Sequence, residues 1–361
     1  MPRTIYPNIT SIRFFLAVLV VIFHVSQFSE NQGLPYFNDW AVFQKGTEAV
    51  YMFFSLSGFL IIKQLYDEKK FTNSINLKAF YTRRALRIFP LYYLILIFGF
   101  LYYQVILPQL GYPVENNYDL LSGILLASTF FSNVFSTFQP GGILEILWSI
   151  GVEEQFYLFI APTLLLLPIK RIKIYLVGFT LVYFSLFFSE AFSFLRTYNM
   201  LFFYFSFSGI CALFMHKFKL NKSHYSLLIP ISVLTIFYFN SNYFKHELGA
   251  ISYHAISMIL FGVFITLLSL KPLKLLEHRS LKYLGKISYG IYMFHPIIMQ
   301  LVGFLFLKYQ LDASENNLVS VVFINVSIIA LTIITSHLSY KYFESYFLSL
   351  KSKSRILYQK K

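Results

Sequence analysis

Residues 12–29 read IRFFLAVLVVIFHVSQFS, an apolar run interrupted by Arg13 and His24 before its polar end. A helix needs about 20 mostly apolar residues to cross a bilayer, and only helices and closed barrels can cross. Barrel strands alternate apolar and polar positions over about ten residues, whereas the apolar runs of this chain are continuous. The run therefore predicts a membrane-spanning helix.

The composition of the whole chain also indicates a membrane protein. Of the 361 residues, 57% are hydrophobic and only 13% are charged. Soluble domains carry about 25% charged residues, so this chain has too much apolar surface for a soluble globule. The same values exclude a disordered chain, a coiled coil and a collagen-like fibre. The single cysteine, Cys211, can form neither an intramolecular disulfide nor a thiolate metal site.

We predict an all-α polytopic membrane protein with about ten transmembrane helices, because apolar runs of spanning length recur along the chain. The approximate spans are residues 12–29, 47–64, 88–107, 144–168, 174–190, 198–215, 225–241, 250–270, 287–307 and 318–340.

The basic residues predict the orientation, because cytoplasmic loops carry an excess of Lys and Arg. If both termini are cytoplasmic, only four of the 30 Lys and Arg residues fall on the opposite side: Lys45, Arg196, Lys245 and Lys308. The net charge of +14 is then mainly a topology signal, with contacts to anionic lipid, and does not indicate nucleic acid.

The apolar stretch 119–138 does not fit this alternation, because a span there would move the next basic cluster to the outer side. We predict a re-entrant or interfacial segment. Residues 1–345 are expected to form one transmembrane domain and residues 346–361 a basic cytoplasmic tail, with no fused extracytoplasmic domain.

Arg13 and His24 are the first candidate site residues, because ionisable groups at membrane depth usually serve a function. Eleven residues of α-helix give about three turns and a rise of about 16 Å, so the two side chains share one face. The plainer alternatives are a snorkelling arginine and an interhelical hydrogen bond.

A second segment, FFSLSGFL at residues 53–60, contains the small residues Ser57 and Gly58. Small residues let a ligand or another helix approach closely, and helix packing is the favoured interpretation of this segment alone.

A third segment, YTRRALRIFPLYY at residues 81–93, carries Arg83, Arg84 and Arg87. We predict that they lie just before the third helix, with Pro90 in its first turn. Clustered guanidinium groups can hold phosphates, although a cytoplasmic topology signal would look similar.

A fourth segment, LWSIGVEEQFYLFIAP at residues 147–162, places Glu153 and Glu154 within an apolar span. Ser149, Glu153 and Tyr157 are spaced by four and form one polar stripe, whereas Glu154 points about 100° away. A glutamate at this depth must be paired, protonated or hydrated.

Two late segments complete the set. In LGKISYGIYMFHP, residues 284–296, Ser288, Tyr292 and His295 share a helix face. In YKYFESYF, residues 340–347, Glu344 lies among aromatic residues and is expected at an interfacial helix end. The chain has no P-loop, no Cys-x-x-Cys and no His-x-x-x-His pair, so no metal site is predicted.

Together these segments, in this order, resemble the integral-membrane acyltransferase-3 family, whose members acylate bacterial surface carbohydrates. The resemblance extends from Arg13 to Glu344. It implies a ten-helix bundle in the bacterial inner membrane with both ends cytoplasmic. It also implies an acyl-CoA donor, usually acetyl-CoA, and a carbohydrate acceptor such as lipopolysaccharide O-antigen, capsule or exopolysaccharide.

The resemblance assigns roles to matching residues. Catalytic roles would fall to His24 and Glu153. The residues that would bind the acyl-CoA are Arg13, Arg83, Arg84 and Arg87. Supporting roles would fall to Ser57, Gly58, Trp148, Ser149, Tyr157, Ser288, Tyr289 and His295. Because a thioester is already activated, the transfer would need no metal.

In this hypothesis His24 acts as general base on a sugar hydroxyl or takes the acyl group itself, and Glu153 orients an imidazole or the hydroxyl. Two other classes stay open. One is an exporter of polysaccharide intermediates, in which the buried Glu and His form a proton relay. The other is a non-catalytic partner of a glycan synthase.

Overall fold

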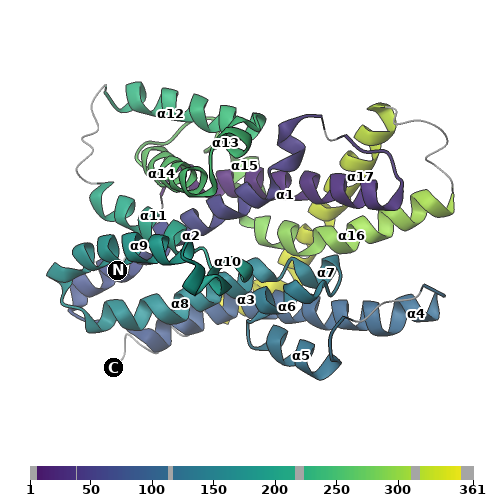
Figure 1. The fold of residues 1–361 in the computed structure, drawn as a ribbon, viewed down its shortest axis with the longest axis horizontal. Coiled ribbons are helices and arrows are strands. Elements are labelled where there is room, and N and C mark those ends of the chain that lie inside the picture. Colours follow the sequence, from purple (N-terminus) through teal and green to yellow (C-terminus); the bar gives the residue numbers. More distant parts are fainter. Residues whose placement is uncertain (1–5, 38, 113–116, 216–222, 310–317, 351–361) are drawn as a thin grey trace.

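The computed structural model describes residues 6–37, 39–112, 117–215, 223–309 and 318–350. Within these ranges the chain forms helices and turns and no strand, which confirms the predicted all-α class. Figure 1 shows α1 (Ile9–Gln32), the first helix, lying beside α16 (Ser288–Lys308) and α17 (Leu318–Ser339), the last two.

The remaining longer helices are α2 (Gly46–Thr72), α3 (Leu77–Leu101), α8 (Trp148–Leu166), α9 (Ile172–Phe187), α11 (Phe202–Phe214), α12 (Ser223–Asn240) and α14 (Ala250–Leu268). The short helices are α4 (Leu107–Gln109), α5 (Leu120–Ser128), α6 (Ser132–Phe135), α7 (Gly142–Glu145), α10 (Phe194–Thr197), α13 (Tyr243–Glu247) and α15 (Arg279–Lys286). Two π-helical turns, Tyr102–Ile106 and Tyr340–Glu344, continue α3 and α17.

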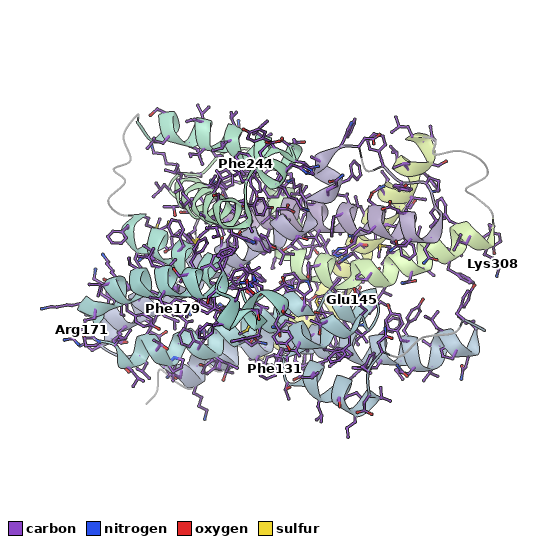
Figure 2. The ribbon with its side chains drawn as sticks, in the orientation of Figure 1. Phe131, Glu145, Arg171, Phe179, Phe244 and Lys308 are labelled. Carbon is purple, nitrogen blue, oxygen red and sulfur yellow. The ribbon has the colours of Figure 1, made fainter. Side chains whose placement is uncertain are left out.

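Every predicted span overlaps one of the longer helices. In the described part of the chain, six helices are long and apolar enough to cross a membrane: Ile9–Gln32, Gly46–Thr72, Leu77–Gln109, Ala250–Leu268, Ser288–Lys308 and Leu318–Leu350. The other four are shorter or, in α8, carry glutamates. The count of ten crossings and the cytoplasmic termini therefore stay predictions. Arg171 and Lys308, which we expect on opposite sides, lie at opposite ends of the molecule in Figure 2.

The third helix begins eleven residues earlier than the predicted residue 88. The side chain of Asn76 accepts a hydrogen bond from the backbone N–H of Ala79 at 2.9 Å, and this cap starts α3 at Leu77. The prediction that the arginine cluster precedes the helix is therefore wrong. Arg83 and Arg87 lie inside α3, and Pro90 lies in its interior rather than in its first turn.

The stretch 119–138 forms α5, α6 and a 3-10 turn instead of one long helix. α5 has nine residues and is too short to cross a bilayer. Tyr92 and Tyr93 of α3 donate hydrogen bonds to the carbonyls of Ala127 and Ser128, at 2.6 and 2.8 Å. These two bonds attach the end of α5 to the side of α3.

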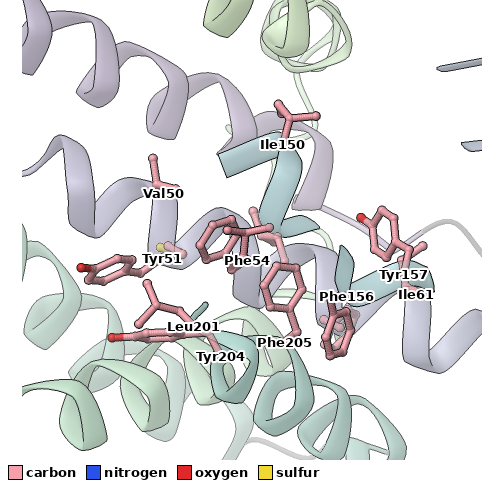
Figure 3. Packing of buried hydrophobic residues seen from close by; sticks show 14 of the residues in the cluster. Val50, Tyr51, Phe54, Ile61, Ile150, Phe156, Tyr157, Leu201, Tyr204 and Phe205 are labelled. Atoms are coloured by element: carbon pink, nitrogen blue, oxygen red, sulfur yellow. The ribbon is translucent and has the colours of Figure 1, made fainter. Parts of the chain in front are cut away.

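The core lies where α2 crosses α11. Figure 3 shows Phe205 stacked between Phe54 and Phe156, with ring centroids 4.8 and 4.5 Å away. The close approach depends on Gly58, since a Cβ at this position would overlap the backbone of Phe205. Helix packing, the favoured interpretation of Gly58, is what the structure shows.

The first described residues of the chain form hydrogen bonds to the loop that follows α14. The Asn8 amide donates to the carbonyls of Leu268 and Lys271, each at 2.7 Å, and its oxygen accepts from the N–H of Leu273 at 2.9 Å. Gly285 of α15 packs directly on the backbone of Thr10, where a Cβ would overlap the carbonyl oxygen. These contacts fix the position of α1 against α15 and α16.

The end of the last described helix differs from the predicted interfacial end. Instead of ending at Glu344, the helix passes through the π-helical turn and continues to residue 350. Glu344 is buried in this turn, with 8% of its surface exposed. Residues 351–361 of the predicted basic tail lie outside the described residues.

Candidate functional site

Two histidines from opposite ends of the sequence meet in the centre of the helix bundle. His24 lies on α1 and His295 on α16, and the two helices pack against each other. Nε2 of His295 lies 3.2 Å from Nδ1 of His24, with ring centroids 5.1 Å apart. His295 is fully buried, whereas His24 is partly accessible. The accessible member of the pair is the one on which the sequence analysis placed the chemistry.

The surrounding acceptors assign the protons of this pair. Nδ1 of His295 lies 2.6 Å from the carbonyl of Tyr292 and must carry a proton to donate there. In neutral His295, Nε2 is then an acceptor. Nδ1 of His24 faces two acceptors, this Nε2 and the carbonyl of Val20 at 3.0 Å, so it is the protonated nitrogen. Nε2 of His24 is left with its lone pair available.

Tyr292 joins the histidine pair to α8. Its hydroxyl donates to the carbonyl of Ile146 at 2.9 Å and lies 2.7 Å from Oγ of Ser149. Of the two residues predicted to share a face of α16, Tyr292 therefore contacts α8 and His295 contacts α1. Trp148 packs edge-on against Phe54, with ring centroids 5.8 Å apart, and closes this region toward α2.

Glu153 is the centre of a second group of contacts. One of its carboxylate oxygens accepts hydrogen bonds from the hydroxyls of Ser57 and Tyr157. The predicted polar stripe on α8 is thus present, and Ser57 on α2 extends it. Gly58, adjacent in sequence, contacts the backbone of α11 instead, so the two small residues of this segment have different surroundings.

Arginines of α1 and α3 form a group, and Arg13 of this group interacts with Glu153. Arg13 interacts electrostatically with Arg84, Arg87 and Glu153. The guanidinium of Arg84 lies 5.6 Å from the centre of the Tyr157 ring, and its Nε is buried without a hydrogen-bond partner in the described part of the chain. Arg84 also interacts with Glu154, and Arg87 with Glu344, so three guanidinium groups and three carboxylates lie together at this end of the site.

Arg83 does not belong to this group, because it pairs with a carboxylate of α2. Its guanidinium forms a half-exposed ion pair with Glu68 of α2 at 3.7 Å. The other two predicted supporting residues are on α16. Ser288 is buried at the first residue of the helix, and the hydroxyl of Tyr289 donates to the carbonyl of Ile88 at 3.0 Å. Tyr289 therefore attaches α16 to α3 beside Arg87.

Near the arginines, sequence reasoning left two buried carboxylates, Glu154 and Glu344, without a functional role. Glu154 is 6% exposed and interacts electrostatically with Arg84, although its Oε1 has no hydrogen-bond partner among the described residues. Glu344 accepts from the hydroxyl of Ser339 at 3.2 Å and interacts with Arg87. Only the placement of Glu154 in an apolar span could have identified one of them from sequence.

The whole arrangement has two connected parts. One is the imidazole pair, which offers a basic nitrogen. The other is the arginine group, which can bind an anion such as a phosphate. Tyr292 lies between them, since it contacts Ser149 and interacts electrostatically with Glu153. Among the described residues no group of three or more His, Cys, Asp or Glu side chains is placed to hold a metal ion.

Comparison with known proteins places this arrangement in context. A family described as an acyltransferase domain matches residues 6–337. A candidate acetyltransferase of Acidianus two-tailed virus is 29% identical over 318 residues, covering 84% of this chain and 86% of the viral protein. No solved structure gives a significant match.

Two bacterial groups of relatives are longer than this chain. The peptidoglycan O-acetyltransferase of Listeria monocytogenes is 31% identical over 176 residues, covering 47% of this chain and 26% of that protein. Candidate O-acetyltransferases of Staphylococcus aureus are 24% identical over 383 residues, covering 94% of this chain and 57% of their own length.

Proposed function

This chain belongs to the acyltransferase family that matches residues 6–337, and from that membership we propose that it is a membrane O-acetyltransferase of carbohydrates. In the proposed reaction an acetyl group moves from a thioester donor, acetyl-CoA, to a sugar hydroxyl. The acyl–sulfur bond breaks, the acyl–oxygen bond forms, and the hydroxyl proton ends on the leaving thiol.

Acetyl-CoA is proposed as the donor because of the arginine group. The donor carries phosphates on its nucleotide and a thioester at the other end of a flexible arm. Arg13, Arg84 and Arg87 are suited to the phosphates, since guanidinium groups bind them with charge-assisted hydrogen bonds. The eleven residues of α1 between Arg13 and His24 correspond to about 16 Å, a distance that the arm can bridge.

His24 is proposed as the general base. Its Nε2 carries the available lone pair, and proton transfer by a positioned imidazole typically contributes about 10²–10⁴ to a rate. His295 is proposed as a positioning residue. Its Nε2 accepts a hydrogen bond from Nδ1–H of His24, and this bond fixes the tautomer of His24. Glu153 is proposed to counterbalance the arginines and, through Ser57 and Tyr157, to hold their arrangement.

The acceptor is proposed to be a carbohydrate of the cell surface, with peptidoglycan, O-antigen, capsule and exopolysaccharide as the candidate classes. The similarity to the Listeria peptidoglycan enzyme supports the first class. The chain would act in the bacterial cytoplasmic membrane, with the arginines toward the cytoplasm, where the donor is made.

The observation that carries this proposal is the contact between His24 and His295. This contact holds the imidazole of His24 so that its Nε2 can accept a proton. We would compare cells that express the protein with cells that express His24→Ala at matched membrane levels. Alkali-labile O-acetyl groups on isolated wall and polysaccharide fractions would be measured by proton NMR. The proposal expects the signal to vanish in the variant.

An O-acetyl signal that persists in His24→Ala cells would contradict the role of this histidine. A signal unchanged by deletion of the gene, together with less polysaccharide at the surface, would favour the exporter with a Glu/His proton relay. Leu227→Ala, at an exposed position of α12 away from the site, serves as the matched control for expression and folding.

A further inference from the structure

Lys286 is an exposed cation at the junction between α15 and α16. Its Nζ lies 4.8 Å from the centre of the Tyr340 ring, which belongs to the π-helical turn of α17. No ion pair joins Lys286 to a carboxylate in the part of the chain that the structure describes. In the predicted orientation this lysine lies on the cytoplasmic side, so its charge can meet a ligand that arrives from there.

The π-helical turn joins this lysine to the arginine group. Tyr340 and Glu344 are four residues apart, so they lie on one face of the turn. Tyr340 contacts Lys286, and Glu344 interacts electrostatically with Arg87 of α3. The turn itself packs against α3, behind which the yellow end of α17 passes in Figure 1. Lys286 and Arg87 therefore lie against the same face of α17.

Two further contacts place the junction between α15 and α16 at the arginine end of the site. Gly285 packs directly on the backbone of Thr10, three residues before Arg13 of α1. The hydroxyl of Tyr289 donates at 3.0 Å to the carbonyl of Ile88, directly after the last arginine of α3. The lysine that lies between Gly285 and Tyr289 in sequence is thus held beside both helices that carry the arginine group.

The balance of charges in the arginine group shows what an additional cation would contribute. Each arginine interacts electrostatically with a carboxylate: Arg13 with Glu153, Arg84 with Glu154 and Arg87 with Glu344. These charges cancel one another, whereas acetyl-CoA carries a diphosphate and a monoester phosphate. A monoester phosphate alone has a charge of about −1.5 to −2 at pH 7. Lys286 adds a positive charge that no ion pair of the described residues balances.

Exposure indicates which phosphate this lysine would meet. The three arginines of the group are partly buried, whereas Lys286 is exposed. A donor whose thioester points inward to His24 has its nucleotide, and the monoester phosphate on it, at the outer end. Planar guanidinium groups suit the diphosphate in the middle of the donor, and the compact ammonium of a lysine suits a terminal monoester phosphate.

We propose that Lys286 binds the monoester phosphate on the nucleotide of the donor and thereby selects acetyl-CoA over a donor that lacks this phosphate. The inference rests on the proposed function and deepens it, because it assigns donor specificity to one residue outside the arginine group. An anionic lipid headgroup presents the same phosphate chemistry at this surface, so the test has to distinguish the two sources.

The test is direct binding without any acceptor. The purified full-length protein in phosphatidylcholine nanodiscs would be titrated with coenzyme A and with dephospho-coenzyme A, which lacks only the monoester phosphate. The wild-type protein should bind coenzyme A about tenfold more tightly, as expected for one charged contact. Lys286→Ala should weaken the binding of coenzyme A about tenfold and leave that of dephospho-coenzyme A unchanged. Lys286→Arg, which keeps the charge, should retain the preference within about threefold.

Lys282→Ala is the matched control, because Lys282 is an exposed lysine of the same short helix that pairs with Glu277 instead. This variant should leave both affinities unchanged. The inference is overturned if the wild-type protein does not distinguish the two ligands, or if Lys286→Ala weakens both equally. It is also overturned if Lys286→Ala has an effect only in nanodiscs that contain phosphatidic acid, since the lysine would then bind a lipid headgroup.

Turnover measurements separate this inference from the proposed function. In inside-out vesicles of the expressing cells, which contain the natural acceptor, Lys286→Ala should raise the KM for acetyl-CoA about tenfold and leave kcat unchanged. The KM for acetyl-dephospho-CoA should not change. A coenzyme A preference that depends on Lys286 in a protein without acetyl transfer would support the phosphate site and contradict the function. Acetyl transfer with equal KM values for the two donors would do the reverse.

Discussion

Pro296 leaves the carbonyl of Tyr292 without its helical donor, and Nδ1 of His295 lies 2.6 Å from that carbonyl instead. In an α-helix the N–H of residue 296 would bond to the carbonyl of residue 292, but proline has no N–H. The side chain one residue earlier in sequence takes the vacant acceptor. A break in the backbone pattern of α16 thereby fixes the tautomer of the buried histidine.

The first prediction follows from this relationship. Pro296→Ala restores an N–H that competes with His295 for the Tyr292 carbonyl. Because alanine is favoured over proline inside helices, we expect the protein to fold with unchanged or higher thermal stability. Acetyl transfer should fall about 10- to 100-fold, since a displaced imidazole loses its alignment. The measurement is the transfer rate of the purified protein beside its melting temperature.

The matched control is Pro230→Ala, because Pro230 lies inside α12 and no site residue is on that helix. This variant should keep the transfer rate. Equal rates for wild type and Pro296→Ala would show that the carbonyl contact does not position His295.

The second prediction concerns the two histidines together. His24→Ala should lower acetyl transfer at least about 100-fold, the lower range for general base catalysis. His295→Ala should lower it less, because it removes only the group that orients the base. If the two act as one unit, the double variant should be no slower than His24→Ala alone. Losses that multiply would mean that His295 has a separate role.

The third prediction separates the two neighbouring small residues of α2. Gly58→Ala adds a methyl group against the backbone of Phe205, and such overpacking destabilises proteins by about 1–3 kcal/mol. The free energy of unfolding should therefore fall. Ser57→Ala removes a hydrogen bond to Glu153 and should leave the melting temperature nearly unchanged while slowing transfer. A single melting series in detergent tests both, and a stable Gly58→Ala protein would contradict the packing argument.

The fourth prediction distinguishes the arginines. Arg84→Ala and Arg87→Ala should each raise the KM for acetyl-CoA about tenfold or more, because these guanidinium groups lie in one group with Arg13. Arg83→Ala should have a smaller effect, since Arg83 pairs with Glu68 on the exposed side of α3. Donor titrations at saturating acceptor provide the comparison. An equal effect of all three would point to general attraction instead of a specific phosphate site.

Local spacing predicted contacts between residues of the same helix. The interval of four between Glu153 and Tyr157 predicted that they share a face, and the hydroxyl of Tyr157 does bond to Glu153. The same reasoning predicted that Arg13 and His24 share one side of α1, and in the structure Arg13 interacts with Glu153 and His24 contacts His295. These relationships lie within one helix, so helical geometry alone determines them.

Relationships between helices could not be predicted in this way. His24 and His295 are 271 residues apart, and their contact depends on how α1 and α16 pack. The start of α3 was missed because Asn76 lies in a polar segment that hydropathy does not resolve. The burial of Glu344 was missed because a π-helical turn changes the direction in which the following side chains point. The sequence of Tyr340–Glu344 carries no signal for such a turn.

The attachment of Asn8 and Thr10 to residues 268–285 has a consequence for biosynthesis. The first helix leaves the ribosome long before α15 and α16 exist, so His24 lacks its partner His295 while most of the chain is made, whereas the partners of Arg13 on α3 and α8 come earlier. During that interval the His24 side chain faces lipid or the insertion machinery. The nascent protein is therefore expected to need protection of its first helix until α15 and α16 are inserted, and a chain truncated after α14 should be degraded instead of accumulating as a partly active enzyme.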